Sequence, residues 1–241
     1  MKGIILAAGT GTRLNGTAIT PKCLVEIGGM SLLRRQIRSL RRSKINDIVV
    51  VLGFEGDSIR TECDDGVHFV ENPQFAQTSS LYSLWLARHH LTEGFVVLNS
   101  DVLFHPQILK DLLESSHDDA LLICYNREST APLGDEEMKV KVKEDVVIDI
   151  SKEMSPLEAD GENVGIVKFS PAGARLLIQY MDDLIAKGSS NAWAPRAFLE
   201  FATHHKLHAV STRGYPWIEI DFPEDYQKAV NEIYPNIEYR A

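Results

Sequence analysis

Short apolar runs bounded by turn-forming residues recur along the chain and predict buried β-strands. The predicted strands are Gly3–Ala7, Asp47–Leu52, Val67–Glu71, Phe95–Asn99, Ala120–Tyr125 and Ala209–Thr212. Amphipathic stretches with helical spacing lie between them, and the predicted helices are Leu32–Arg42, Ser79–Leu91, Pro106–Ser115 and Pro171–Lys187. The alternation of strands and helices predicts an α/β fold of the Rossmann-like type, with a mainly parallel sheet flanked by helices. Such sheets bind ligands beyond the carboxyl ends of their strands.

The apolar pattern changes to strict alternation after Asp135. Lysines at 139, 141 and 143 alternate with valines, and Val146–Ile150 follows after a Glu144-Asp145 turn. This pattern predicts an accessory β-hairpin with one solvent-exposed face. Two roles stay open for it, a flap beside a substrate site and the protection of a sheet edge.

Length and composition indicate one globular unit. The chain has 241 residues, of which 44% are hydrophobic and 24% charged, and it contains no Pro/Gly/Ser-rich linker. We therefore expect a single domain over residues 1–241. No run of about 18 apolar residues occurs, and the first strand is too short for a signal-peptide core, so we expect a cytoplasmic protein without a membrane partner. The three cysteines form no C-x-x-C pair and are typical of free thiols.

Charge argues against nucleic acid as a partner. The formal net charge is −9, whereas phosphate backbones are bound by clusters of Lys and Arg. The basic residues between Arg34 and Lys44 fall on a helical pattern and are interpreted as a solvated helix face. His204 and His208 have helical spacing but no third ligand nearby, so we interpret them as surface histidines.

A glycine-rich turn follows the first predicted strand and points to phosphate binding. Gly9 and Gly11 allow positive φ, so that consecutive backbone N–H groups can converge on phosphate oxygens. Arg13 and Lys22 add positive charge around the same phosphates. The spacing fits neither a Walker A loop nor a dinucleotide fingerprint. An ordinary strand-to-helix turn is the alternative.

Acidic residues stand where a ligand crevice is expected. Asp101 closely follows the strand Phe95–Asn99, and alternation directs Glu219 and Asp221 to the same side of an extended segment. Two carboxylates facing a triphosphate repel it unless a cation lies between them. Mg²⁺ prefers one or two carboxylates together with phosphate oxygens and water, so Asp101 and Asp221 are candidate ligands, with Glu219 less directly involved.

The glycine loop and the segments after it resemble a known family. The segments LAAGTGTRL and PKCLVEIGG resemble the opening signature of nucleotidyltransferases that act on sugar phosphates and small alcohol phosphates. The segments SSLYSLWLA, VVLNSDVLF, ENVGIVKFS and WIEIDFPEDYQKA continue in the family's order. Within this GT-A-like superfamily the chain looks most like short CTP:phosphocholine cytidylyltransferases and their aminoalkylphosphonate relatives.

The resemblance implies Mg²⁺-dependent transfer of CMP from CTP to a small phosphorylated or phosphonate acceptor, with release of pyrophosphate. Phosphocholine and 2-aminoethylphosphonate are typical acceptors, and a sugar-1-phosphate or polyol-phosphate nucleotidyltransferase is the alternative. Both substrates are small molecules. The sequence does not decide whether the chain forms a homodimer.

The resemblance also assigns roles to residues. Lys22 and Arg13 are the implied catalytic residues. The implied nucleotide-binding residues are Leu6, Ala7, Ala8, Gly9, Thr10, Gly11, Thr12, Ser79, Ser80 and Asn99. The implied metal ligands are Asp101, Asp221 and Glu219, and the candidate acceptor-binding residues are Lys152, Glu162, Trp193 and Tyr215. Ser79 is equally a candidate N-cap of the helix that follows.

Two rival readings are less consistent with the sequence. A nucleotide-sugar glycosyltransferase normally shows an Asp-x-Asp metal motif, whereas the matching place here has Asn99, Ser100 and Asp101. A catalytically silent nucleotide-binding regulator would have lost the lysine or a metal aspartate, yet Lys22, Asp101 and Asp221 are all present.

Overall fold

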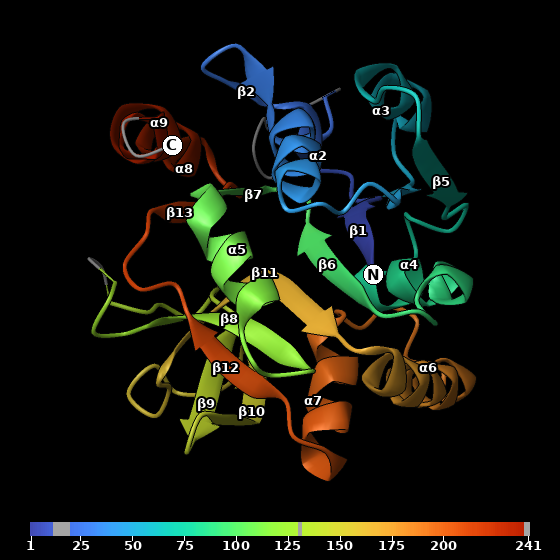
Figure 1. Ribbon diagram of the computed structural model, residues 1–241, viewed down its shortest axis with the longest axis vertical. Helices are drawn as coiled ribbons and strands as arrows, with labels where there is room; N and C mark the ends of the chain where they lie inside the picture. Colours follow the sequence, from blue (N-terminus) through green and yellow to red (C-terminus); the bar gives the residue numbers. More distant parts are fainter. Residues whose placement is uncertain (12–19, 130–131, 239–241) are drawn as a thin grey trace.

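A nine-stranded sheet forms the centre of the computed structural model, which describes residues 1–11, 20–129 and 132–238 (Figure 1). In spatial order its strands are β5 (Val67–Glu71), β4 (Ile48–Leu52), β1 (Lys2–Ala7), β6 (Phe95–Asn99), β11 (Gly161–Phe169), β8 (Ala120–Tyr125), β12 (His208–Ser211), β10 (Val146–Ser151) and β9 (Lys139–Lys143).

Strand directions divide the sheet into two halves. Strands β5, β4, β1 and β6 pair in parallel. Strand β11 runs antiparallel to both β6 and β8, and β12 lies parallel to β8. The parallel half has helices on both faces, so β4 is buried at every position, as expected for the sequence IVVVL. The predicted Rossmann-like α/β fold is confirmed, with a mixed sheet.

Helices cover both faces of the sheet. Helices α4 (Ser80–Leu86), α6 (Pro171–Ala186) and α7 (Pro195–His204) pack on one face, and α2 (Leu32–Arg42), α3 (Gly56–Glu62) and α5 (Pro106–Glu114) pack on the other. The side chains of β1 alternate between them, because successive residues of a strand point to opposite faces. Ile4 and Leu6 join the core under α4, whereas Ile5 and Ala7 join the core under α2.

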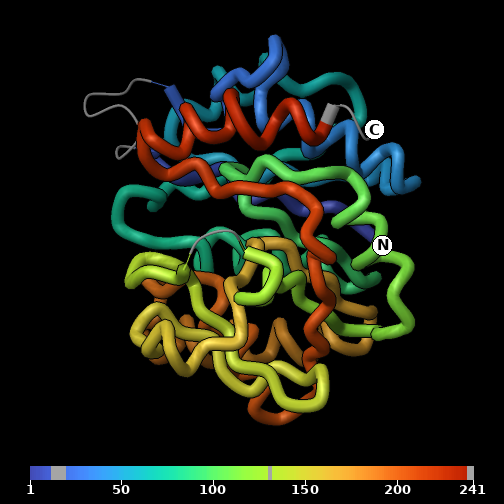
Figure 2. Tube along the Cα trace, turned by 90° about the vertical axis from the view of Figure 1, so that its left-hand side faces the viewer, coloured from blue at the N-terminus to red at the C-terminus, as the bar shows by residue number. Residues whose placement is uncertain are grey.

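The C-terminal segment closes one end of the molecule. It consists of α8 (Pro223–Lys228), the π-helical turn η3 (Ala229–Ile233) and α9 (Tyr234–Glu238). Figure 2 shows this red segment crossing the same end as the small blue hairpin β2 (Glu26–Ile27) and β3 (Met30–Ser31). A separate apolar cluster joins Ile27, Leu103, Ala229 and Ile237 there. This packing places β13 (Trp217–Glu219) against β7 (Val102–Phe104) in an antiparallel pair.

Most predicted elements are present with small changes at their ends. The predicted helix Leu32–Arg42 matches α2 at both ends, whereas the predicted helix Ser79–Leu91 ends early and is followed by a 3₁₀ turn, η2 (Arg88–His90). A second 3₁₀ turn, η1 (Lys22–Leu24), holds the lysine of the glycine loop region. The pattern did not predict β11, because polar residues and Gly165 interrupt its apolar run.

The accessory hairpin is confirmed, but the face that we expected to be exposed to solvent is partly buried. Glu144 and Asp145 both have positive φ, which gives the tight turn between β9 and β10. The prediction that its lysines face solvent is wrong for Lys139, which is fully buried. Lys139 lies at the start of β9, where β11 pairs with it and covers that end of the hairpin.

Within the described ranges, no helix combines the length and apolar character needed to cross a membrane.

Gly165 provides a test of how β11 fits against β6. Its φ is +78°, and a Cβ there would lie 2.7 Å from Nδ2 of Asn99. We expect Gly165→Ala to lower the free energy of unfolding by about 1–2 kcal/mol from the left-handed conformation alone, and further from the clash. Gly66→Ala is the matched control, because Gly66 also has positive φ but no atom lies within 4 Å of its Cβ position. Equal losses in urea unfolding would contradict close packing against Asn99.

Candidate active site

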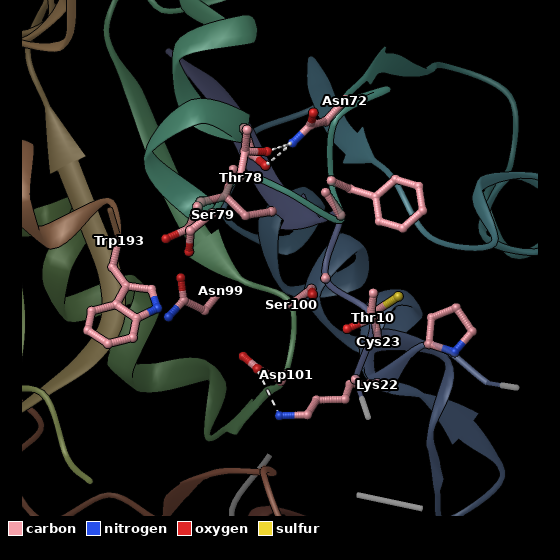
Figure 3. Close-up of a pocket in the computed structure, with 18 of the residues that line it drawn as sticks. Thr10, Lys22, Cys23, Asn72, Thr78, Ser79, Asn99, Ser100, Asp101 and Trp193 are labelled. Carbon is pink, nitrogen blue, oxygen red and sulfur yellow. Dashed lines mark hydrogen bonds and ion pairs between the residues drawn. The ribbon is translucent and has the colours of Figure 1, made fainter. Parts of the chain in front are cut away.

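A cavity of about 340 Å³ opens at the carboxyl ends of β1 and β6 (Figure 3). The predicted nucleotide-binding residues that line it are Leu6, Ala8, Gly9, Thr10, Gly11, Ser79, Ser80 and Asn99. Ala7 does not line it, since the alternation along β1 turns Ala7 into the core under α2. Thr12 and Arg13 lie outside the described residues. The loop and the two strand ends therefore meet where the sheet rule expects a ligand.

Gly11 is required by the approach of Lys22. The residue has a φ of +62°, and a Cβ there would lie 2.9 Å from Cγ of Lys22. Any larger residue would meet the lysine side chain while adopting a conformation that L-residues rarely adopt. The glycine loop and η1 therefore pack closely enough to aim Lys22 along the cavity wall.

A buried asparagine that the sequence reasoning missed organises the opposite wall. Asn72 follows β5 and is 2% exposed. Its Nδ2 donates to Oγ1 of Thr78 and Oγ of Ser83, both at 3.0 Å, and its Oδ1 accepts from the backbone N–H of Gln74 at 2.9 Å. These bonds hold the loop before α4, and Figure 3 shows the amide of Asn72 directed toward Thr78. The signal was available, because Asn72 is a polar residue directly after a predicted strand, and Asp101 stands two residues after another.

The two serines at the start of α4 have different roles. Ser79 stands at the N-cap position, but its side chain makes no capping hydrogen bond. Ser80 accepts a hydrogen bond on Oγ from the backbone N–H of Ala194 at 2.8 Å. That bond ties α4 to the segment before α7, which carries Trp193 into the cavity lining.

The turn that carries Asp101 is held from behind by Gln36 of α2. The side chain of Gln36 is 1% exposed, and its Nε2 donates to the carbonyls of Asn99 at 2.8 Å and Val102 at 3.0 Å. On the other side, the carbonyl of Asp101 accepts from the backbone N–H of Ile220 at 3.0 Å. These contacts bring β13 beside the turn.

Three carboxylates converge next to Lys22. Asp101, Glu219 and Asp221 each offer an oxygen, and these oxygens lie within 4.8 Å of one another. Lys22 Nζ is hydrogen-bonded to Oδ1 of Asp221 and lies 3.7 Å from Oδ2 of Asp101. Figure 3 shows the lysine and Asp101 pointing toward each other at one end of the cavity. The predicted metal ligands and the predicted catalytic lysine therefore form one cluster.

Electrostatics at this cluster favour a bound cation. Burial, followed by the charges of Asp101 and Asp221, raises the pKa of Glu219 to about 8, while Lys22 acts in the opposite direction. Crowded carboxylates repel one another, and a cation relieves that repulsion. The donor set consists of carboxylate oxygens, which hard divalent cations prefer, so the residues fit such an ion.

A second cavity, of about 380 Å³, lies on the other side of the carboxylates and shares Glu219 with the first. Among the residues that line it are the acidic residues Glu128, Glu136, Glu137, Glu162 and Asp225 and the aromatic residues Tyr215, Trp217 and Phe222. Burial, followed by the charge of Glu137, raises the pKa of Glu162 to about 7, and the charge of Lys139 opposes this rise. The carboxylate cluster thus stands between a polar cavity and an acidic, aromatic one.

The four candidate acceptor-binding residues are divided between these cavities. Glu162 and Tyr215 line the second cavity, and the ring of Tyr215 is stacked on His105 at 4.7 Å between centroids. Trp193 lines the first cavity instead. Lys152 lines neither, but its Nζ lies 5.0 Å from the ring centroid of Trp193. Trp193 therefore stands apart from the acidic cavity, whereas Lys152 reaches its edge, because Lys152 Nζ lies 3.7 Å from the carboxylate of Glu136.

Comparisons with known proteins agree on one family. The model of the MobA-like NTP transferase domain matches residues 3–157. The chain is 29% identical to choline-phosphate cytidylyltransferase of Streptococcus pneumoniae, over 98% of this chain and 99% of that protein. It is 24% identical to CTP:phosphoglutamine cytidylyltransferase of Campylobacter jejuni, over 96% and 100% of the two chains. The solved CTP:phosphocholine cytidylyltransferase from Streptococcus pneumoniae superposes with a TM-score of 0.77 at 26% identity, covering 94% of this chain and 96% of that one.

The carboxylate cluster predicts a measurable cation effect. We expect millimolar Mg²⁺ or Mn²⁺ to raise the thermal midpoint by a few degrees, because a ligand that binds only the folded state stabilises it. Asp101→Asn and Asp221→Asn should each remove most of this shift. Asp57→Asn, an exposed position on α3, is the control and should retain it. An unchanged shift in both cluster variants would place the cation elsewhere.

Proposed function

Because the chain belongs to the MobA-like NTP transferase family, we propose that it transfers CMP from CTP to a small phosphorylated or phosphonate acceptor, releasing pyrophosphate. The observation that carries the proposal is the placement of Lys22 and the three carboxylates between two cavities. Donor and acceptor then meet at the charged cluster. The full-length similarity to two cytidylyltransferases supports CTP as the donor.

The reaction needs positioning and charge neutralisation more than acid–base chemistry. An oxygen of the acceptor phosphate attacks the α-phosphorus, forming a P–O bond as the bond to the β-phosphate oxygen breaks and pyrophosphate leaves. A deprotonated acceptor phosphate is already a nucleophile, so no general base is required. Lys22, which lines the first cavity and bonds to Asp221 of the second, offsets the negative charge that builds up when the two phosphate groups approach. Arg13, outside the described residues, keeps its predicted role beside the leaving pyrophosphate.

Magnesium fits the carboxylate cluster as the cofactor. Asp101 and Asp221 would hold it, with Glu219 beside them, since oxygen ligands within 4.8 Å of one another suit Mg²⁺. When bound, Mg²⁺ neutralises charge on the phosphoryl oxygens of the nucleotide. Lys22 contacts the same carboxylates, so it limits their mutual repulsion in the free enzyme.

The second cavity supports an acceptor that carries a positively charged amine. Its lining combines carboxylates with aromatic faces, and both interact favourably with ammonium groups. A neutral hexose would instead call for a denser set of amide and carboxylate partners around its hydroxyl groups. This contrast favours phosphocholine, phosphoethanolamine or aminoalkylphosphonates over hexose 1-phosphates.

A matrix of donors and acceptors tests this proposal. We expect pyrophosphate release to be fastest with CTP among the four common nucleoside triphosphates, and to stop in excess chelator. Removing the amine from the best acceptor should lower kcat/KM at least about fivefold, as expected for one partly desolvated cation contact. A preference for a hexose 1-phosphate would instead favour the sugar-nucleotide alternative, and a higher kcat/KM with UTP, dTTP or ATP would overturn the choice of CTP.

The role of Lys22 is tested by removing its charge. We expect Lys22→Ala to lower kcat at least about 100-fold, which is the scale of losing one dedicated transition-state charge. Lys2→Ala is the control, because Lys2 also pairs with an aspartate, Asp47 at 3.2 Å, but at the start of β1. Near-normal turnover of Lys22→Ala would remove Lys22 from the mechanism.

A further inference from the structure

Lys139 is a buried cation that the proposed chemistry does not use. It belongs to the alternating sequence KVKVK of β9, in which Lys141 is partly exposed and Lys143 exposed. Lys139 itself has no solvent-exposed surface. A buried ammonium group is costly unless every donor is satisfied, so its surroundings need a physical explanation.

Three backbone carbonyls surround the ammonium group. Lys139 Nζ donates to the carbonyls of Asp135 and Glu137, both at 3.1 Å, and of Lys152 at 2.8 Å. These three bonds use all three N–H donors of a lysine, whereas the amide of Gln has only two. The lysine thus joins the segment before β9 to the segment after β10.

The residues held in this way border the second cavity. Residues 132–138, called the rim segment below, contribute Glu136 and Glu137 to its lining. Within the rim segment, the carboxylate of Glu137 accepts from the backbone N–H of Gly134 at 2.9 Å. The carboxylate of Glu136 lies 3.7 Å from Nζ of Lys152. The ammonium of Lys139 therefore binds the backbone of Lys152 and of the two residues that flank Glu136.

Lys139 also lies beside the acidic wall of the cavity. It stands directly opposite Glu162 in the antiparallel pairing of β9 with β11, and opposite residues share a face of the sheet. The backbone N–H of Asn163 donates to the carbonyl of Met138 at 2.9 Å, which joins the rim segment to β11. The positive charge of Lys139 favours the ionised form of Glu162, against the burial that raises its pKa.

We propose that Lys139 is a positioning residue for acceptor selection: its ammonium group holds the rim segment so that the carboxylates of Glu137 and Glu162 line the second cavity together. This inference rests on the proposed function, since the selected feature is the amine of the acceptor. A rim segment released from Lys139 would no longer present Glu137 next to Glu162, and the cavity would discriminate less between amine-bearing and amine-free acceptors.

The test compares Lys139→Met with the control Lys141→Met. Both variants remove a lysine from β9, but Lys141 bonds to the carbonyl of Glu158 and lies 3.5 Å from Asp160, and both partners lie outside the rim segment. Steady-state kinetics of each variant are measured in three series. The varied substrate is the best amine-bearing acceptor in the first, its amine-free analogue in the second and CTP in the third. Hydrogen exchange of residues 132–138 is measured in the same proteins.

We expect Lys139→Met to raise KM for the amine-bearing acceptor about tenfold, while KM for CTP and kcat/KM for the amine-free analogue change less than about threefold. Exchange of the rim segment should accelerate while β1, β4 and β6 stay protected. Lys141→Met should behave as the parent in all of these measurements. An equal loss with both acceptors, or a loss confined to CTP, would overturn the proposal.

The remaining outcomes are also decisive. If Lys139→Met fails to fold, Lys139→Gln, which retains two N–H donors, takes its place. Failure of both to fold would overturn the proposal, because a residue that only positions the rim is not needed by the central sheet. A parent enzyme without amine preference would overturn the acceptor class together with this inference. If the parent enzyme prefers amine-bearing acceptors and Lys139→Met retains that preference, this inference alone would be overturned.

Discussion

Electrostatic repulsion among Asp101, Glu219 and Asp221 is the constraint around which this molecule is arranged. The three carboxylates come from a turn after β6 and from the end of β13, far apart in the sequence, and their oxygens lie within 4.8 Å of one another. Such a group is unfavourable unless positive charge lies beside it. Pairing of β13 with β7 and the buried Gln36 hold the backbone in place, while Lys22 supplies positive charge beside Asp101 and Asp221.

The antiparallel strand β11 separates the two sides of the site. On the side of the parallel strands, the ends of β1 and β6 and the glycine loop form a polar cavity suited to a nucleotide. On the other side, Glu162 of β11 borders the acidic cavity together with the rim segment and the C-terminal segment. Gly165 allows β11 to approach Asn99, which lines the first cavity, while Glu162 of the same strand lines the second. The two cavities thereby lie on either side of one carboxylate cluster.

The family match covers only part of the lining of the second cavity. Residues 3–157 match the NTP transferase domain, and they include the glycine loop, Lys22 and Asp101. Glu162, Tyr215, Trp217, Glu219 and Asp221 follow that region. The rim segment, by contrast, lies within the matched region. Lys139 connects the two, because it belongs to the matched region yet stands opposite Glu162.

The sequence by itself determined the elements whose signal is local. Apolar runs gave the parallel strands, helical spacing gave α2 to within a residue, and glycine spacing located the loop beside the first cavity. Polar residues at strand ends indicated Asp101, and the same rule, applied more widely, would have found Asn72. Only the tertiary structure decided the rest. Burial of Lys139, separation of Trp193 from the acidic cavity and convergence of Glu219 with Asp101 depend on pairings between distant segments, and local periodicity carries no information about such pairings.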